Sequence, residues 1–269
     1  MRFDNKVTVI TGASSGIGLA LSKEFASRGS KVVMGALPGT GLADRAAEVS
    51  AMGEALWLDM DVTKPEECSS LIELATGRYG RIDHLICSAG ISMRAIFDEV
   101  RLDVLHRVMD VNFWGVVNCT KHALPHIQQT GGSIVGISSV AGLHGLPGRT
   151  GYSASKFALI GFLETIRVEN LKKGVHVMVA HPGFTATNIR FHALTADGSK
   201  QGESPRNEER MMTAEYVANR IARGIKRRRN TLLMDFTGYG TMILKLLVPR
   251  IVDRIYYSHM AKEPDSPFK

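Results

Sequence analysis

The chain has 269 residues, of which 44% are hydrophobic and 22% are charged. This length suits one α/β domain, and the proportion of apolar residues excludes an intrinsically disordered chain. Three cysteines without a Cys-x-x-Cys pair exclude a disulfide framework and a zinc ribbon, whereas the net charge of +7 leaves nucleic acid, a membrane surface or an anionic cofactor open as partners.

The start of the chain, residues 1–5, is polar and charged, where a secretory signal would need an apolar stretch. No run of about 18 apolar residues, the length needed to span a bilayer, occurs anywhere in the sequence. We therefore expect a soluble, cytoplasmic protein without a secretory signal, for which peripheral contact with a membrane stays open.

Short apolar runs alternate regularly with amphipathic stretches along the chain. Residues 7–10, for example, form a β-branched run that ends in a glycine turn, as a buried strand does. The expected strands are residues 7–10, 31–36, 55–58, 82–87, 133–137, 175–180 and 231–234. The expected helices are residues 19–27, 42–52, 65–79, 102–129, 153–171 and 213–226.

This alternation predicts an α/β protein with a single doubly wound, Rossmann-like domain. The strands are apolar along their whole length, which predicts a mostly parallel seven-stranded sheet with helices on both faces. Right-handed crossovers give the default strand order 3-2-1-4-5-6. No repeat and no linker divides this catalytic domain, which we place at residues 1–237.

Two segments fall outside the alternation. Residues 184–212 are rich in glycine, serine, asparagine and charge, and we expect a lid over the substrate, with an unselective surface loop as the alternative. Residues 238–269 form an apolar and basic extension, in which Pro249 separates two short helices. Such an extension suits a membrane surface, another subunit or its own domain, and all three stay open.

A glycine-rich turn follows the first strand and opens a helix. From Thr11 to Gly18 it reads Thr-Gly-Ala-Ser-Ser-Gly-Ile-Gly, with glycines spaced GxxxGxG. Glycines let the backbone approach a pyrophosphate, which then lies at the helix N-terminus, where free N–H groups favour anions. The position after the first strand favours dinucleotide binding over a plain turn. The expected contacts are Gly12, Ser14, Ser15, Gly16, Ile17 and Gly18.

The choice between NAD and NADP depends on the end of the second strand. An acidic residue there would bind the ribose hydroxyl of NAD, but residues 34–39, which include the expected contact Leu37, contain none. They also contain no arginine for the extra phosphate of NADP. The missing acid favours NADP and leaves NAD open. After the third strand, Asp61 is a candidate for the adenine amino group, with a helix N-cap as an equal alternative.

Four residues form a candidate catalytic set. Tyr152 and Lys156 are four positions apart, hence on one face of a helix. Ser139 lies just past the fifth strand, where ligands of open α/β sheets bind, and Asn112 lies in the long preceding helix. A nearby ammonium favours phenolate, so Lys156 would lower the pKa of Tyr152 towards the working range of an acid–base catalyst. Ser139 would hydrogen-bond the substrate oxygen.

Together these motifs resemble the short-chain dehydrogenase/reductase family over roughly residues 6–234. The family's TGxxxGxG is residues 11–18, its Asn-Asn-Ala-Gly appears as Cys-Ser-Ala-Gly at residues 87–90, and its catalytic residues are Asn112, Ser139, Tyr152 and Lys156. The resemblance implies an NAD(P)-dependent oxidoreductase in which Tyr152 is the acid and base and Asn112 holds a water that relays protons from Lys156. Further expected cofactor contacts are Val62, Ser88, Ala89, Gly90, Tyr152, Lys156, Pro182, Gly183, Thr185 and Thr187.

The resemblance also concerns substrate and partners. The C-terminal extension resembles those of family members that reduce lipid-like ketones, such as hydroxysteroid dehydrogenases and 3-ketodihydrosphingosine reductases. This implies a lipophilic small-molecule substrate and peripheral membrane contact through residues 238–260. Family members usually pair through the helices at residues 102–129 and 153–171, which implies a homodimer or homotetramer.

Two other functions compete with this one. A non-catalytic cofactor-binding regulator or scaffold would gain nothing from keeping all four catalytic residues. The basic run 226–229 lacks a reading helix or an aromatic pattern, so we expect no nucleic acid. No His/Cys/Asp cluster has metal-ligand spacing, so we expect no catalytic metal. Four residues stay open between structural and functional roles: Cys87 (redox thiol), His181 (base), and His144 and Arg149 (substrate border).

Overall fold

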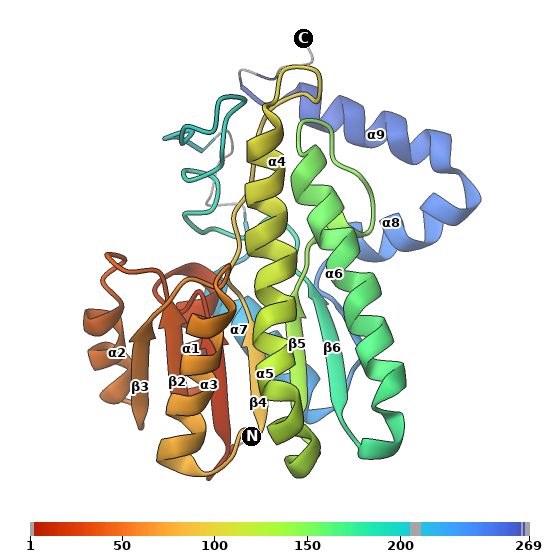
Figure 1. Ribbon diagram of the computed structural model, residues 1–269. Helices are drawn as coiled ribbons and strands as arrows, with labels where there is room; N and C mark the ends of the chain where they lie inside the picture. Colours follow the sequence, from red (N-terminus) through yellow and green to blue (C-terminus); the bar gives the residue numbers. More distant parts are fainter. Residues whose placement is uncertain (1–2, 205–210, 265, 267–269) are drawn as a thin grey trace.

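The computed structural model describes residues 3–204, 211–264 and 266. A seven-stranded sheet with parallel pairing throughout runs in the order β3-β2-β1-β4-β5-β6-β7 (Figure 1). The strands are β1 (Val7–Thr11), β2 (Lys31–Ala36), β3 (Ala55–Asp59), β4 (His84–Cys87), β5 (Ser133–Ile137), β6 (His176–His181) and β7 (Thr231–Leu233). The main helices are α1 (Gly16–Ser27), α2 (Leu42–Ser50), α3 (Pro65–Tyr79), α4 (Leu102–Met109), α5 (Gly115–Thr130), α6 (Thr150–Glu169), α7 (Ala214–Lys226), α8 (Phe236–Leu247) and α9 (Pro249–Ala261).

The predicted fold class is confirmed. The strand order is the default doubly wound order, with β7 added beside β6. From β1 the chain adds β2 and then β3 on one side of β1, and it then returns to add β4 on the other side. The direction of strand addition therefore reverses between β1 and β4. In open α/β sheets the crevice at this reversal, outside the carboxyl ends of the strands, is where ligands bind.

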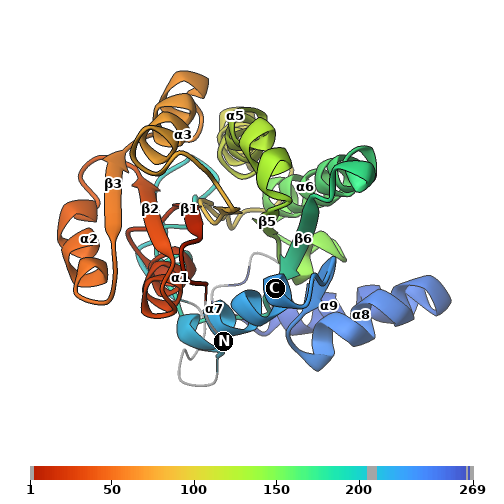
Figure 2. The same cartoon turned by 90° about the horizontal axis from the view of Figure 1, so that it is seen from below.

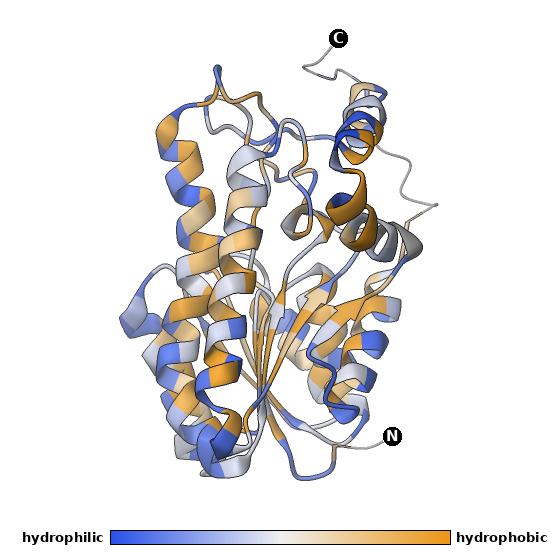
Figure 3. Cartoon of the chain, turned by 90° about the vertical axis from the view of Figure 1, so that its right-hand side faces the viewer, coloured by the Kyte–Doolittle hydropathy of each residue, from blue (hydrophilic) through white to orange (hydrophobic). Residues whose placement is uncertain are grey.

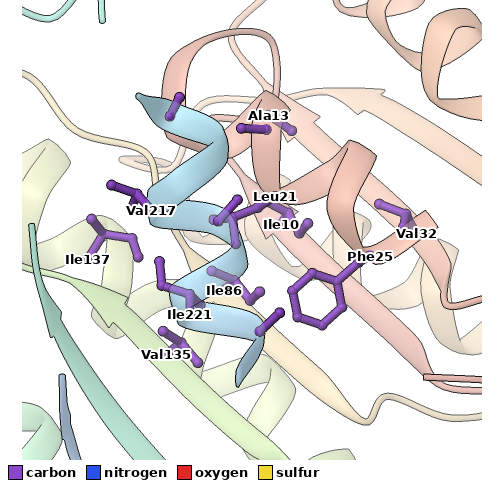
Figure 4. Packing of buried hydrophobic residues seen from close by; sticks show 14 of the residues in the cluster. Ile10, Ala13, Leu21, Phe25, Val32, Ile86, Val135, Ile137, Val217 and Ile221 are labelled. Carbon is purple, nitrogen blue, oxygen red and sulfur yellow. The ribbon is translucent and has the colours of Figure 1, made fainter. Parts of the chain in front are cut away.

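Helices cover both faces of the sheet. Figure 2 shows α3, α5 and α6 on one face and α1 and α7 on the other, each above its own hydrophobic cluster. Figure 3 shows strands that are mostly hydrophobic between helices that are hydrophobic mainly on one side. In Figure 4, Val217 and Ile221 of α7 face Leu21 of α1 and Ile10 of β1, all fully buried. Each such side chain contributes about 1.5–3 kcal/mol to folding.

The long helix predicted at residues 102–129 is present but contains a wider, π-helical turn, Asp110–Trp114, between α4 and α5. Asn112 lies in this turn and is fully buried. Its amide accepts a hydrogen bond from Ile91 N–H at 2.8 Å and donates one to Ile91 C=O at 2.9 Å. These bonds to a neighbouring loop offset the irregular helical bonding, a competition that helical periodicity in the sequence does not reveal.

Two helices begin three residues earlier than predicted. α1 begins at Gly16 instead of residue 19, so the last glycines of the glycine-rich turn are already helical. α6 begins at Thr150 instead of residue 153, which places Tyr152 in its first turn. The expected apolar spacing begins only where a helix meets the core, so it misses first turns that border a cavity.

The C-terminal extension folds as two helices, with Pro249 as the first residue of α9. Val252 and Tyr256 of α9 are buried against Ala141 and Leu146, which belong to the loop between β5 and α6. The extension therefore contacts its own domain through one face of α9. No helix among the described residues has both the length and the apolar character needed to cross a membrane.

The other faces of these two helices expose large apolar side chains. Leu246 and Leu247 at the end of α8 are 82% and 72% exposed. The remaining exposed apolar residues of this pair are Tyr239, Met242, Ile243, Leu244, Ile251, Ile255 and Tyr257. We call this set of nine residues the arm surface.

The fold predicts a specific loss of stability in acid. His84 of β4 is buried against the rings of Phe3 and Phe25, with centroids 5.5 and 6.0 Å away, and burial lowers its pKa to about 4. The unfolded imidazole has a pKa near 6.5, so the unfolded state binds more protons between these values and stability falls as the pH drops from about 6.5 to 4. We expect His84→Phe to remove roughly 2 kcal/mol of the stability difference between pH 7 and 4.5, measured by urea unfolding. His126→Phe, in a partly exposed position on α5, is the matched control. An equal acid loss in wild type and His84→Phe would contradict the assignment.

Candidate active site

A cavity of about 740 Å³ opens at the carboxyl ends of the strands. All the residues that the sequence assigned to a site line this cavity except Asn112, which is buried just behind it. The lining residues among them are Gly12, Ser14, Ser15, Gly16, Ile17, Gly18, Leu37, Asp61, Val62, Ser88, Ala89, Gly90, Ser139, Tyr152, Lys156, Pro182, Gly183, Thr185 and Thr187. The fold thus brings together residues from seven separate segments of the sequence into one hollow.

The glycine turn after β1 is packed so tightly that side chains are excluded. A Cβ on Gly18 would lie 2.1 Å from the carbonyl oxygen of Gly12, and a Cβ on Gly12 would lie 2.7 Å from the backbone of Ala89. Gly12 and Gly16 also have φ of +65° and +52°, in the left-handed region that favours glycine. Ser15, the N-cap of α1, makes no side-chain capping bond, and the first turn holds no acidic residue. The N-terminus of α1 therefore suits a pyrophosphate.

Thr11 braces this turn, a role that the sequence analysis missed. Its hydroxyl oxygen accepts hydrogen bonds from the N–H groups of Ser88 and Ala89, each at 3.2 Å. These bonds join the end of β1 to the end of β4, beside the position where two asparagines of the family pattern are replaced. The threonine that begins the TGxxxGxG pattern was the available signal. Cys87, next to it, is buried, and burial raises the pKa of its thiol to about 12, which disfavours a redox role.

The far end of the cavity lies beside β2 and β3. Leu37 stands at its rim with half of its surface exposed. The carboxylate of Asp61 accepts bonds from the N–H and the hydroxyl of Thr63, both at 2.9 Å, and so stabilises the turn that leads into α3. Asp61 is not the helix N-cap that the sequence offered as the alternative, because the N-cap of α3 is Lys64. Asp61 and Val62 both lie on the cavity wall. Thr40 and Met60 also line this end and were not predicted.

Ser139, Tyr152 and Lys156 lie together in the middle of the cavity. The hydroxyl of Ser139 lies beside the phenol of Tyr152 and acts to lower its pKa. Ser139 is the N-cap of a short 3-10 turn, where its Oγ accepts a bond from Ala141 N–H at 3.2 Å. The ammonium of Lys156 lies 5.6 Å from the centre of the Tyr152 ring and donates to Ile137 C=O at 2.9 Å. Backbone bonds therefore hold both neighbours of the phenol.

Burial shifts both titratable groups of this cluster towards their neutral forms. It raises the pKa of Tyr152. Ser139, and next the positive charges of Arg149 and Arg190, act in the opposite direction and lower this pKa. Burial lowers the pKa of Lys156 to about 8. The sequence pointed to Lys156 as the charge that favours phenolate. In the structure, the positive charges that oppose the effect of burial on Tyr152 come from two arginines.

Asn112 reaches the cluster from behind. Besides its two bonds to Ile91, its amide nitrogen donates to Ser155 Oγ at 3.0 Å. A Cβ on Gly90 would lie 3.2 Å from Asn112 Oδ1 and 3.6 Å from Lys156 Nζ, so both polar groups border the space above this glycine. Asn112 thus fixes the loop after β4 and faces Lys156 across a gap that a side chain would close.

Residues 184–201, in the segment predicted to be a lid, contribute to the cavity wall. Residues 184–212 pair with the loop after β4 through a parallel bridge between Met93 and Leu194, and their own ends pair at Thr185 and Met212. The lid and the neighbouring loops contribute both apolar and cationic side chains to the cavity. Those that the sequence analysis did not assign are Ile91, Met93, Arg94, Leu146, Phe184, Ile189, Arg190 and His192.

The structure also places the residues whose roles the sequence left undecided. Arg149 lines the cavity, whereas His144 faces α9, stacked on Tyr256 with ring centroids 4.7 Å apart. Burial lowers the pKa of His144, against the nearby carboxylate of Asp253. His181 is buried, and its Nδ1–H donates to Ser139 C=O at 3.2 Å, so it supports the Ser139 turn. Within the described part of the chain, no three His, Cys, Asp or Glu side chains are grouped as metal ligands.

Comparison with known proteins identifies the family. The family model described as short chain dehydrogenase matches residues 6–197. The chain belongs to the short-chain dehydrogenase family. It is 33% identical to the dehydrogenase/reductase SDR family member 7B of Mus musculus over 269 residues, which cover 97% of this chain and 83% of the relative. It is 37% identical to the 11-beta-hydroxysteroid dehydrogenase-like 2 of Arabidopsis thaliana over 263 residues, covering 94% and 82%.

A solved structure supports the same conclusion. The short chain dehydrogenase/reductase from Burkholderia phymatum, in complex with NAD, superposes with a TM-score of 0.82 and is 25% identical, covering 94% of this chain and 96% of that one. This protein is therefore a member of an oxidoreductase family whose structures hold nicotinamide cofactors, and the glycine turn, the free N-terminus of α1 and the cavity fit such a group.

The turn geometry predicts the effect of one methyl group on cofactor binding. In Gly18→Ala the Cβ would meet the Gly12 carbonyl at 2.1 Å, so the turn must open and the N-terminus of α1 must move. We expect NADPH and NADH affinity, read from nicotinamide fluorescence, to fall at least about tenfold, which corresponds to about 1.4 kcal/mol. Gly77→Ala in α3, where a Cβ would meet nothing within 4 Å, is the matched control and should bind as wild type does. Undiminished binding by a folded Gly18→Ala protein would contradict the assignment.

Proposed function

We propose that this protein transfers hydride between a nicotinamide cofactor and the carbonyl or secondary-alcohol carbon of a lipophilic small molecule, with Tyr152 as acid and base. The observation that supports this most directly is the gathering of Ser139, Tyr152 and Lys156 in the cavity that the glycine turn closes at its other end. The cofactor would supply the hydride chemistry, and the protein would bind, orient and exchange protons.

Each residue has a separate role in the proposal. Tyr152 exchanges a proton with the substrate oxygen. Ser139, whose hydroxyl lies beside that phenol, binds the same oxygen and stabilises its developing charge. Lys156, with a pKa of about 8, is mostly protonated at neutral pH and so contributes positive charge beside the phenol. Asn112 holds a water in the space above Gly90, where its Oδ1 and Lys156 Nζ both border the gap.

The cofactor contacts are part of the same proposal. The glycine turn and the N-terminus of α1 bind the pyrophosphate, and the ends of β2 and β3 at Leu37, Asp61 and Val62 receive the adenosine half. The loops at residues 88–90 and 182–187 receive the nicotinamide half. NADP is favoured over NAD because β2 ends without the carboxylate that would repel the additional phosphate.

The substrate is proposed to be lipophilic because of the lid and the extension. Apolar side chains from the loop after β4, the lid and the β5–α6 loop border the substrate end, and α9 packs behind Leu146 on that loop. We also propose that the arm surface makes peripheral membrane contact. Lys245, Arg250 and Arg254 accompany its apolar side chains, with Asp253 as the opposing charge, a composition that suits anionic lipid.

A homo-oligomer is proposed on a different surface. Trp114, in the π-helical turn between α4 and α5, and Val168 of α6 are 51% and 60% exposed. Large apolar residues exposed on these helices suit an isologous interface with a second copy of the chain. Sedimentation of wild type and Trp114→Lys would measure this association.

The central test of the proposal is Tyr152→Phe. Removing the phenolic oxygen leaves the ring packing but no group to exchange the proton, so we expect turnover to fall at least about a thousandfold while cofactor affinity stays within about twofold. The assay follows NADPH and NADH absorbance with a broad panel of ketones and secondary alcohols. Tyr216→Phe, exposed on α7, is the matched control. Near-normal turnover in Tyr152→Phe would overturn the mechanism, and cofactor binding without turnover on any substrate would favour the non-catalytic regulator.

The membrane proposal has its own test. Leu246→Asp/Leu247→Asp places charges at the two most exposed leucines of the arm surface, where folding should not be affected. We expect wild type to float with vesicles that contain anionic lipid and the double variant to lose most of this binding. Leu171→Asp, at a 66% exposed leucine after α6, is the matched control. A wild-type protein that does not bind such vesicles, and that prefers small sugars in the substrate panel, would overturn both the membrane contact and the lipophilic substrate.

A further inference from the structure

A charged cluster joins the C-terminal segment to the substrate end of the cavity. Glu263, two residues beyond α9, is buried, with 4% of its side chain exposed. Its Oε2 lies 2.8 Å from Arg149 Nη2 and 3.6 Å from Arg94 Nε. Arg94 also donates a hydrogen bond to Pro264 C=O. Both arginines line the cavity, so a residue near the end of the chain reaches its wall.

The three parts of this cluster come from loops that are otherwise tied together by backbone bonds. Arg94 N–H donates to Leu194 C=O in the lid at 2.8 Å, and Ala95 N–H donates to Gly148 C=O at 3.0 Å, next to Arg149. The carboxylate of Glu263 therefore closes a ring of contacts among the loop after β4, the loop before α6 and the C-terminal segment. The side chains of Arg94 and Arg149 are only 9% and 12% exposed, so loss of the buried carboxylate between them would leave strong repulsion.

Arg149 connects this cluster to the phenol. It is the residue that precedes α6, three positions before Tyr152, and its positive charge acts on the phenolic oxygen together with that of Arg190. A carboxylate 2.8 Å from Arg149 offsets part of that charge and fixes where the guanidinium lies. Burial of both partners makes this effect stronger than at the surface, because water screens it little.

We propose that Glu263 is a positioning residue of the active site, which holds the Arg149 guanidinium beside Tyr152 and limits the positive charge that reaches the phenol. The C-terminal extension is then part of the electrostatic environment of the proposed reaction, and this inference rests on the proposed role of Tyr152. It assigns a function to a segment that lies beyond the residues matched by the family model.

Other charged and titratable groups also face Tyr152 and must be held constant. Lys156 stands on the same helix, Arg190 comes from the lid and Tyr256 from α9, where its hydroxyl is bonded to Thr241. The further ionisable groups around the cavity are Arg94, Asp103, His106, Arg107, Asp110 and His192. Substituting Glu263 leaves all of these residues in place, but it also removes the carboxylate beside Arg94, so the Arg149 variants are needed to identify which guanidinium acts on the phenol.

The test measures the ionisation of Tyr152 directly. Glu263→Gln keeps the shape and an oxygen acceptor for Arg149 but removes the negative charge. We expect the pH at which Tyr152 ionises to fall by about 0.5 units or more, because the Arg149 charge is no longer offset. The measurement is the ultraviolet absorbance of phenolate in each protein, with NADP⁺ present, minus that of the same protein carrying Tyr152→Phe. This subtraction removes the contribution of the other tyrosines.

Companion variants separate positioning from a merely structural role. Arg149→Gln removes the guanidinium charge that acts on the phenol and should raise the ionisation pH. Arg149→Gln/Glu263→Gln should return it to within about 0.2 units of wild type. Asp253→Asn, which removes another carboxylate of the extension, 3.3 Å from His144, is the matched control and should leave the titration unchanged. Arg149→Gln alone carries the test if Glu263→Gln does not fold.

The outcomes are distinct. An ionisation pH that is the same in wild type, Glu263→Gln and Arg149→Gln overturns the inference, including the case in which no phenolate forms below about pH 11 in any of them. Loss of thermal stability in Glu263→Gln without a change in the titration also overturns it, because the residue would then only hold the fold together. Turnover is not used, so a failure of the proposed function, seen as near-normal activity of Tyr152→Phe, is recognised separately.

Discussion

The glycine turn after β1 and the loop after β4 pack so closely that only hydrogen atoms fit between their backbones. Gly12 and Gly18 leave room for the carbonyl of the turn and for the backbone of Ala89, and Thr11 pulls the end of β4 into the same place through two hydrogen bonds. Because of this packing the N-terminus of α1 points at the cavity, and the loop at residues 88–90 forms its floor. The positions of Asn112 and Lys156 above Gly90 follow from the same contact.

Burial of Tyr152 and Lys156 determines how readily these two groups change protonation in the proposed reaction. A phenol and an ammonium that are removed from water both resist becoming or staying charged, so small changes in nearby charge decide their protonation. The cavity wall contains several cationic groups, among them Arg149 and Arg190, and few described carboxylates lie close enough to oppose them. These cationic groups offset part of the cost of placing negative charge on the buried phenol or on a bound oxygen, although the pKa of Tyr152 stays raised.

The sequence predicted the sheet, its order and most of the cavity wall because those features follow from local patterns. Apolar runs identified the strands, and the GxxxGxG and Tyr-x-x-x-Lys spacings identified two sides of the cavity. The contacts that it missed depend on residues far apart in the chain. Thr11 with Ser88, and Arg149 with Glu263, are 77 and 114 positions apart, and nothing in either local segment indicates the partner. The early starts of α1 and α6 were missed because their first turns contain glycines and serve a cavity, so the apolar spacing of a helix becomes regular only after them.

The π-helical turn at Asp110–Trp114 also has a consequence for how this segment can change. One inserted residue rotates everything after it by about 100° around the helix axis, so α4 and α5 present different sides to the rest of the protein. α4 can then face the lid while α5 packs on the sheet, although they form one rod. Shortening the rod by a single residue here would turn the buried stripe of α5 towards solvent, which makes this turn a point where length, and not only residue identity, is fixed by the architecture.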